Sequence, residues 1–334
     1  MNTLSNKKVL FFAPKFFGYE LAIKAKLEEM GADVTYFDER PKNTFWTKVF
    51  IRINRNIISS QIKKYYNQVL NQTAAKQFDY VFVVNLEAMT PKVIEKLRKQ
   101  QPNARFILYM WDSIRNKKPA QIAFPLFDWC YSFDRDDANN LTNVVFRPLF
   151  FIDTFDTYKW KDKPNVKYDL CFIGTVHSDR YNLISDVKKQ LLDSSKSFYF
   201  YMYFHNRVLF LYKKFRDVKF LKAPYSEFNF NSISAIEIMN KIKHSFAVFD
   251  VQHPYQTGLT MRTIEMIGAE RKLITTNKAI AQYDFYNPNN ILIIDRNKPI
   301  LKNEFWDTPY QPIDEEQRKY YSIEGWIKTI FKLA

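Results

Sequence analysis

Along the first half of the chain, short apolar runs alternate with longer stretches in which apolar residues recur every three or four positions. A short apolar run bounded by polar residues is typical of a buried strand, and the longer periodicity is typical of a helix that packs on one side. The predicted strands are Val9–Ala13, Val34–Phe37, Tyr80–Val84, Phe106–Met110 and Trp129–Phe133. The predicted helices are Gly18–Met30, Lys48–Leu70, Pro91–Gln100 and Asp134–Leu141. This alternation predicts a parallel sheet covered by helices on both faces.

The same pattern starts again after an irregular stretch, Pro148–Val166, which we interpret as an inter-domain connection. The later predicted strands are Asp169–Ile173, Ser197–Tyr203, Phe246–Asp250, Leu273–Thr276 and Ile291–Ile294, before a helical tail over Glu315–Leu333. The chain is therefore expected to be α/β, with two doubly wound Rossmann-like domains facing across a cleft. Residues 1–150 form the first domain and residues 151–312 the second, and the tail 313–334 is expected to pack back on the first. Ligands of such folds bind outside the carboxyl ends of the strands.

A dense group of polar residues follows the predicted strand that ends at Asp250. A helix is expected to start near Thr260 and to end at Gly268. The backbone N–H groups at its N-terminus suit a phosphate, and the carboxylate of Glu265 could accept hydrogen bonds from a ribose diol. The candidate donor-binding residues here are Thr257, Gly258, Leu259, Thr260, Arg262 and Glu265. The alternative is a simple βαβ crossover in which Arg262 and Glu265 form a solvated ion pair.

A second polar group follows the first strand of the second domain. It consists of Gly174, Thr175, His177 and Arg180, and it is expected to face the same cleft. Gly174 permits close approach of a ligand to the backbone, and Arg180 or Arg262 could supply positive charge to a phosphate. His177 is as well explained as a surface loop residue. Together, the two groups predict a nucleotide-sugar site.

The formal net charge of +15 calls for an anionic partner, and 17% of the residues are aromatic. Aromatic and basic residues are interleaved over Phe198–Arg216 and, less densely, over Phe45–Arg55. Such segments suit the headgroup region of an anionic membrane surface, but they are equally explained as core aromatics beside a solvated basic face. Nucleic acid is not an expected partner, because no recognised binding motif appears.

Other features of the sequence restrict the compartment and the chemistry. No stretch approaches the roughly 18 uncharged apolar residues of a membrane span, and the N-terminus lacks the features of a signal peptide. We therefore expect the protein in the cytoplasm or on the inner face of a membrane. Cys130 and Cys171 lie in apolar runs and are predicted to be buried strand thiols, and the four histidines lack metal-ligand spacing. No metal and no cofactor are expected.

Three segments carry a resemblance to a known family: Tyr168–Arg180, Thr257–Glu265 and Lys272–Asn277. They resemble the GT-B glycosyltransferases of bacterial capsule and lipopolysaccharide biosynthesis and, more remotely, the CgeB-like (spore maturation) group. The resemblance is specific over about residues 168–295 and only architectural over 1–150. It implies that Arg262 and Glu265 lie at the nucleotide sugar.

The chain departs from that family at one informative position. Many retaining GT-B enzymes carry two glutamates eight positions apart; Glu265 matches the second, but Thr257 stands at the first. The resemblance therefore leaves both inverting and retaining transfer open. The catalytic base is expected from the first domain, where Asp112 and Glu20 are the candidates, although each is also explained as a helix cap or first-turn carboxylate. The Asp-x-Asp pair at Asp134 is expected to cap a helix.

These observations predict a glycosyltransferase that moves a sugar from a nucleotide-sugar donor to a surface polysaccharide or lipid-linked glycan acceptor. Enzymes of this fold usually neutralise the leaving group with backbone amides and basic side chains rather than with a metal. The alternative is a non-catalytic protein that binds a nucleotide sugar or a glycan within a polysaccharide assembly complex. A basic nucleic-acid-binding α/β protein is a more distant alternative.

Overall fold

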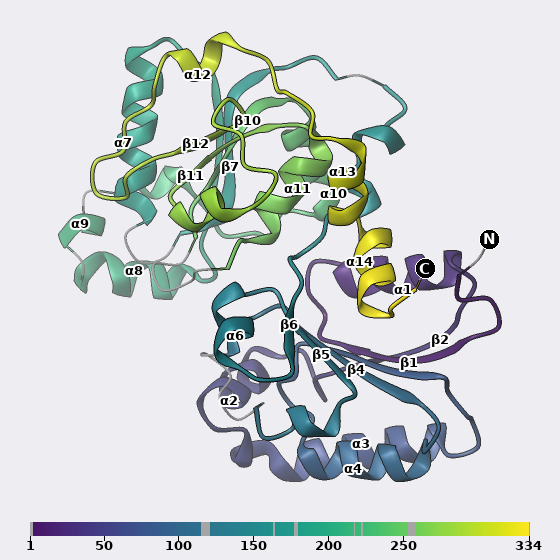
Figure 1. Cartoon of the computed structure of the whole chain (residues 1–334). Coiled ribbons are helices and arrows are strands. Elements are labelled where there is room, and N and C mark those ends of the chain that lie inside the picture. Colours follow the sequence, from purple (N-terminus) through teal and green to yellow (C-terminus); the bar gives the residue numbers. More distant parts are fainter. Residues whose placement is uncertain are drawn as a thin grey trace. The chain divides into compact units, whose positions relative to one another are not determined.

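The structure is a computed structural model that describes residues 3–114, 121–162, 164–176, 180–216, 218–221, 223–252 and 258–333, with the backbone alone at 216, 218 and 219. The chain divides into two compact units (Figure 1). Unit 1 consists of Met1–Phe150 and Lys319–Ala334, and unit 2 consists of Phe151–Arg318. No helix within the described ranges is both long and apolar enough to span a bilayer.

Unit 1 contains a six-stranded sheet in which every neighbouring pair is parallel, in the order β2-β1-β3-β4-β5-β6. Its strands are β1 (Lys8–Ala13), β2 (Asp33–Asp38), β3 (Tyr80–Val84), β4 (Arg105–Met110), β5 (Trp129–Ser132) and β6 (Val144–Phe146). Its helices are α1 (Tyr19–Glu29), α2 (Phe45–Asn54), α3 (Ser59–Thr73), α4 (Pro91–Gln100), α6 (Arg135–Asn140) and α14 (Ile323–Ile330). Figure 1 shows α3 and α4 along one face of this sheet and α1 and α14 along the other.

The two faces of the unit 1 sheet bury different sets of apolar side chains. On the α3 and α4 face, strand residues such as Leu10 and Val83 join a cluster with Tyr66 and Leu97. On the other face, the fully buried indole of Trp326 in α14 packs on Phe82, Tyr109 and Phe150. The C-terminal tail therefore contributes a large part of the core of unit 1.

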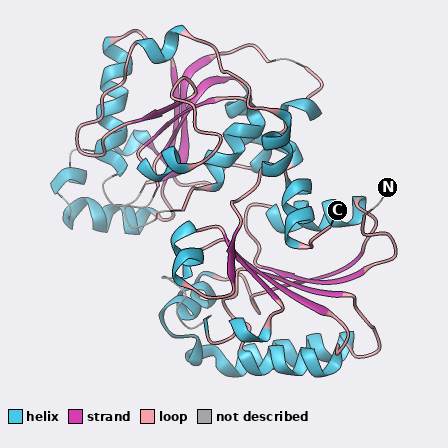
Figure 2. Cartoon of the chain, in the orientation of Figure 1, coloured by secondary structure: helices cyan, strands magenta, loops and turns pink. Residues whose placement is uncertain are grey.

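Unit 2 contains a second parallel six-stranded sheet, in the order β12-β11-β10-β7-β8-β9. Its strands are β7 (Tyr168–Thr175), β8 (Phe198–Tyr203), β9 (Phe228–Asn229), β10 (Ser245–Asp250), β11 (Lys272–Thr275) and β12 (Ile291–Ile293). Its helices are α7 (Arg180–Asp193), α8 (Arg207–Arg216), α9 (Val218–Leu221), α10 (Ala235–Lys243), α11 (Met261–Ala269) and α12 (Glu304–Asp307), and α13 (Glu315–Tyr321) contains the boundary with unit 1. Figure 2 shows helices on both sides of each sheet.

These two sheets confirm the predicted α/β class with two Rossmann-like units. One predicted helix was wrong in extent. The stretch Lys48–Leu70 is not one helix, because Asn54 is extended (φ −159°, ψ 100°) and its side chain accepts a hydrogen bond from the backbone N–H of Asn56. The tail is helical, as predicted, and it consists of two helices because Ser322 caps α14 by accepting from the N–H of Gly325 at 3.1 Å. Cys130 and Cys171 are buried free thiols in β5 and β7, as predicted.

Each sheet has one switch point, where the chain turns from building one side of the sheet to building the other. In unit 1 it lies between β1 and β3, and in unit 2 it lies between β7 and β10. Loops that leave the carboxyl ends of such a strand pair diverge to opposite faces, and the divergence opens a crevice suited to ligands. The topology therefore places a candidate site in each unit at the carboxyl ends of the strands, which we call the carboxyl edge of the sheet.

Candidate functional site

The switch point of unit 2 brings together the two groups of residues that the sequence singles out. Gly174 and Thr175 end β7, and Asp250 ends the adjacent strand β10. Gly258 and Leu259 lie between β10 and the helix α11, whereas Thr257 and His177 lie outside the described residues. Segments that are more than seventy residues apart in the sequence thus meet at one edge of the sheet.

The N-terminus of α11 is held in place by a network of hydroxyl groups on Asp250. Thr260 is the N-cap, and its Oγ1 accepts a hydrogen bond from the N–H of Thr263 at 3.2 Å. The hydroxyls of Thr260 and Thr263 both donate to Oδ2 of Asp250, at 2.6 and 3.0 Å. This network fixes the direction of the helix relative to β10, so the N–H groups of its first turn are preorganised for an anion.

Arg262 and Glu265 form an ion pair on α11, with 2.5 Å between Nη1 and Oε2. The two side chains are only 18% and 6% exposed, so this is not the solvated pair of the alternative interpretation. Glu265 does not lie on an exposed helix face, because every residue of α11 from Thr263 to Ala269 is buried. A buried arginine holds a carboxylate in one orientation much more firmly than solvent does.

The same arginine also acts on β7. Burial raises the pKa of the Cys171 thiol to about 11, and the positive charge of Arg262 opposes that rise. The positive charge of Arg262 therefore acts on Cys171, in the middle of β7.

Four further polar residues at this edge were not among the predicted donor-binding residues: Gln252, Thr276, Asn277 and Arg296. Thr276 and Asn277 do lie in the segment Lys272–Asn277 that carries the family resemblance. Thr276 donates to the side-chain oxygen of Gln252 at 2.5 Å, and Arg296 donates to the backbone carbonyl of Gln252 at 3.1 Å. The side chain of Asn277 lies 3.5 Å from the carbonyl oxygen of Gly258. Gln252, Thr276 and Asn277 lie within two residues of the end of β10 or β11, and that position after a buried strand is the signal that could have identified these three.

Arg180 occupies the first turn of α7 and folds back on the strand before it. Its Nη1 donates to the carbonyl oxygen of Thr175 at 2.9 Å. A Cβ at Gly174 would lie 3.2 Å from the ring of Phe172, so this part of the strand is tightly packed. The end of β7 therefore carries a second arginine close to the switch point.

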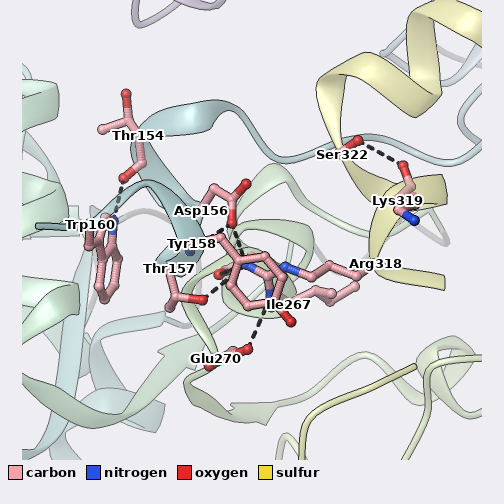
Figure 3. Close-up of polar contacts among 11 residues, drawn as sticks. Thr154, Asp156, Thr157, Tyr158, Trp160, Ile267, Glu270, Arg318, Lys319 and Ser322 are labelled. Atoms are coloured by element: carbon pink, nitrogen blue, oxygen red, sulfur yellow. Dashed lines mark hydrogen bonds and ion pairs between the residues drawn. The ribbon is translucent and has the colours of Figure 1, made fainter. Parts of the chain in front are cut away.

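The C-terminal end of α11 is fixed by Arg318, which is almost fully buried (Figure 3). Its guanidinium donates to the carbonyls of Ile267 and Gly268 and forms ion pairs with Asp156 and Glu270. A cation suits this position because the last carbonyls of a helix have no partners within the helix and carry partial negative charge. Figure 3 also shows the ring of Tyr158 at the guanidinium, with 4.0 Å from Cζ to the ring centroid.

The prediction that Gly268 ends the helix was wrong. The helix continues to Ala269, and Glu270 takes the left-handed conformation at its end, with φ 49°. Glycine is required at position 268 for close approach instead, since a Cβ there would lie 2.6 Å from the ring of Phe151 and 2.7 Å from the carbonyl oxygen of Phe155. The segment that begins unit 2 therefore packs directly on α11, and the helix is fixed at both ends.

The two candidate bases, Glu20 and Asp112, lie at the carboxyl edge of the other sheet, in unit 1. Glu20 is in the first turn of α1 and accepts a hydrogen bond from the N–H of Phe16 at 3.0 Å. Asp112 is half-buried and follows Trp111 at the end of β4. The rings of Phe16 and Trp111 are in contact, with centroids 5.5 Å apart. Both carboxylates therefore flank one aromatic contact beside the switch point of unit 1.

The Asp-x-Asp pair has the capping role that the sequence predicts. Asp134 is the N-cap of α6, and its Oδ1 accepts a hydrogen bond from the N–H of Asp136 at 3.0 Å. Among the residues that the structure describes, no three His, Cys, Asp or Glu side chains group in a way that could hold a metal ion.

Comparison with solved structures finds full-length likenesses of low sequence identity. An α-glucosyltransferase in complex with UDP and a 13-mer DNA has a TM-score of 0.57 at 14% identity, with 87% of each chain covered. The UDP-GlcNAc 2-epimerase of Methanocaldococcus jannaschii has a TM-score of 0.54 at 11% identity, with 98% of this chain and 99% of that chain covered. The catalytic domain of starch synthase IV from Arabidopsis thaliana, bound to ADP and acarbose, has a TM-score of 0.55 at 9% identity, with 99% and 96% covered.

No family model and no curated protein matches the chain. The likeness to solved structures concerns the fold, and it extends over both units. The chain therefore has the GT-B fold, the arrangement of two Rossmann-like units found in these glycosyltransferases and this epimerase.

Proposed function

We propose that the protein is a nucleotide-sugar-dependent glycosyltransferase whose donor binds at the carboxyl edge of the unit 2 sheet. The observation that carries the proposal is the convergence of a capped helix N-terminus, an ordered ion pair and several arginines at one switch point. A diphosphate needs N–H donors and positive charge, and a ribose needs an acceptor for its hydroxyls. The UDP and ADP complexes of the solved neighbours support the same ligand class.

In this proposal each residue has a separate role. The first-turn N–H groups of α11 and the backbone at Gly174 and Gly258 bind the diphosphate. Arg262 holds the Glu265 carboxylate at 2.5 Å so that it can accept from the ribose hydroxyls. Arg180 and Arg296 add positive charge that stabilises the leaving phosphate, without a bound metal or another cofactor.

The acceptor, we propose, is a surface polysaccharide or a lipid-linked glycan of the kind made in capsule or lipopolysaccharide biosynthesis. The support for this is the resemblance of residues 168–295, together with the large excess of positive charge. A base is needed for the acceptor hydroxyl, and Asp112 and Glu20 are the carboxylates proposed for it. Such a reaction places the enzyme in the cytoplasm or on the inner face of the cytoplasmic membrane.

The donor site can be tested by calorimetric titration of the purified protein with UDP, GDP and CMP. At least one nucleotide should bind, and Glu265→Gln should weaken that binding by about tenfold or more, because a charge-assisted hydrogen bond is worth about 1.5–3 kcal/mol. Glu237→Gln is the matched control. Glu237 closes the capping box of α10 in the same unit, so its loss should lower stability slightly and leave nucleotide affinity unchanged.

Donor turnover then separates an enzyme from a binding protein. Release of free nucleotide from the matching nucleotide sugar, stimulated by glycan acceptors and reduced in Asp112→Asn or Glu20→Gln, would support the catalytic role. Tight nucleotide binding without turnover would instead favour a non-catalytic component of an assembly complex. No binding by any of the nucleotides would contradict the proposed function.

A further inference from the structure

Helix α8 of unit 2 turns an apolar face outward. Val208, Leu211, Tyr212 and Phe215 follow the spacing i, i+3, i+4, i+7 and therefore lie along one side of the helix. All four are exposed, Val208 by 74% and Phe215 by 81%. Water-soluble surfaces normally place polar side chains on such a face, so this stripe needs an explanation.

The opposite side of α8 anchors it to unit 2. Phe210 is fully buried and contacts the rings of Phe204, Phe220 and Phe228. Within the aromatic segment Phe198–Arg216, the residues that belong to the core or pack against it are Phe198, Phe200, Met202, Phe204 and Phe210. The stripe residues of the helix face outward. The orientation of the stripe is therefore set by core packing.

Helix α2 of unit 1 repeats this design. Ile51 packs against the core and Thr47 is buried, whereas Phe45, Trp46 and Ile53 on the other side are exposed. The rings of Phe45 and Trp46 are in contact, with centroids 5.4 Å apart. Two separate helices thus present aromatic and aliphatic side chains outward.

Charge identifies the partner of these two stripes. α8 carries two arginines and two lysines and α2 carries one lysine and one arginine, and neither helix contains an acidic residue. Both lysines of α8 lie on the core side, because Lys213 lies 4.7 Å over the ring of Phe220 and Lys214 donates to the carbonyl of Ala223. The match to anionic headgroups therefore comes from the absence of acidic residues on both helices and from the formal net charge of +15. A nucleic acid would leave the stripes without an apolar partner. An anionic lipid surface accounts for each of the two helices taken separately.

We infer that α8 and α2 are interfacial helices that bind the surface of an anionic bilayer, with Val208, Leu211 and Phe215 of α8 and Trp46 and Ile53 of α2 entering the headgroup region. Each helix has ten residues, about 15 Å in length, which suits a helix lying in the interface rather than crossing it. The assignment of glycan assembly to that surface rests on the proposed function, but the lipid contact itself does not.

Sedimentation of the full chain with vesicles tests this surface. The protein should bind vesicles that mix phosphatidylcholine with phosphatidylglycerol much more tightly than vesicles of phosphatidylcholine alone, and added salt should weaken the binding. The double variant Leu211→Ser with Phe215→Ser should bind the vesicles about tenfold or more weakly than the wild type. The double variant Trp46→Ser with Ile53→Ser should show the same loss. Ile236→Ser in unit 2 and Ile122→Ser in unit 1 remove comparably exposed apolar side chains outside both helices and should bind as the wild type does.

Three results would overturn the inference: no binding to either vesicle, equal binding to both, or tighter binding to duplex DNA that the serine variants leave unchanged. Formation of a dimer that the serine variants abolish, without vesicle binding, would assign the stripes to a second copy instead. The nucleotide titration, run on the same proteins, separates this from the donor site. Vesicle binding without nucleotide binding would contradict the proposed function and support the lipid surface. Nucleotide binding without vesicle binding would support the donor site and contradict the lipid surface.

Discussion

Unit 1 and unit 2 each contain a parallel six-stranded sheet with a switch point, but different side chains fill the carboxyl edges of the two sheets. In unit 1 the fully buried Glu39, directly after β2, accepts the N–H groups of Glu87, Ala88 and Met89 at 2.9, 2.6 and 2.7 Å. Arg40 forms a buried pair with Glu87 at 2.7 Å. Carboxylates at this edge thus bind the protein's own loop.

In unit 2 the corresponding edge is built from hydroxyl, amide and guanidinium groups around the end of a helix. Among the described residues, Asp250 accepts hydrogen bonds from the side chains of Thr260 and Thr263 and holds no backbone loop. The same strand topology therefore supports two different uses of the edge, and the residues that directly follow the strands determine which use applies. This difference is why we assign the donor to unit 2.

The mutation expected to have the largest effect on stability is in unit 1. Glu39→Ala removes the acceptor of three buried N–H groups, and each such group costs about 1–3 kcal/mol when it is left without a partner. The free energy of unfolding should fall by about 3 kcal/mol or more, measured by urea titration at pH 6. Glu20→Ala is the matched control at the same edge, because Glu20 is also buried but accepts, among the described residues, one backbone N–H, that of Phe16. An equal loss in both variants would show that the Glu39 contacts do not hold the loop.

A pair of aspartate variants with smaller effects on stability should distinguish a structural role from a role in ligand binding. Asp250 in unit 2 and Asp137 in unit 1 are both 8% exposed. Asp250 accepts hydrogen bonds from the hydroxyls of Thr260 and Thr263, and Asp137 accepts from the N–H of Ile114 and from the hydroxyls of Ser132 and Ser113. Changing either to alanine should lower the free energy of unfolding by about 2 kcal/mol.

The two aspartate variants should differ in nucleotide affinity. Only Asp250→Ala should weaken it, by about tenfold, since Asp250 orients the N-cap of the helix proposed to bind the diphosphate. If both variants, or neither, lost affinity in the calorimetric titration, the assignment of the donor to unit 2 would fail.

The sequence predicted the longer buried strands and helices better than the short strands at the edges of the sheets. Tyr80–Val84 and Pro91–Gln100 have the predicted bounds, because a buried apolar run and a proline at a helix start are local signals. The short strands Val144–Phe146 and Phe228–Asn229 were missed, since two or three residues at a sheet edge carry no periodicity. Gly268 was misinterpreted because its close contact with Phe151 depends on a segment more than a hundred residues away.

The candidate site shows the same division between local and distant information. The polar residues of Gly258–Glu265 could be identified because they are consecutive, and strand order alone placed Gly174 beside them. Arg296 could not, because it reaches Gln252 from a position 44 residues further along the chain. Glu39 was not identified either. It follows the strand as one of three charged residues, and only the tertiary fold shows that its carboxyl group is buried.

The pH dependence of stability offers the finest test of the contrast between the two edges. Burial raises the pKa of Glu39 to about 8, the charge of Glu87 adds to the rise, and the three N–H contacts oppose it. The unfolded carboxyl has a pKa near 4.3, so between these values the folded protein holds a proton that the unfolded chain has lost. Stability from this group is present at low pH and is lost as the pH rises through 8.

The loss should amount to about 1 kcal/mol between pH 7 and pH 8, measured as the difference in free energy of unfolding between the wild type and Glu39→Gln. The glutamine keeps an oxygen for the three N–H groups but does not titrate, and the other groups around it, Glu87, Arg40 and Tyr66, are the same in both proteins. A difference that stays constant with pH would mean that Glu39 is already ionised at pH 7. Unit 1 would then hold a buried negative charge at the carboxyl edge of its sheet. The two carboxyl edges would in that case differ in the geometry of their hydrogen bonds but not in the protonation of their carboxyl groups.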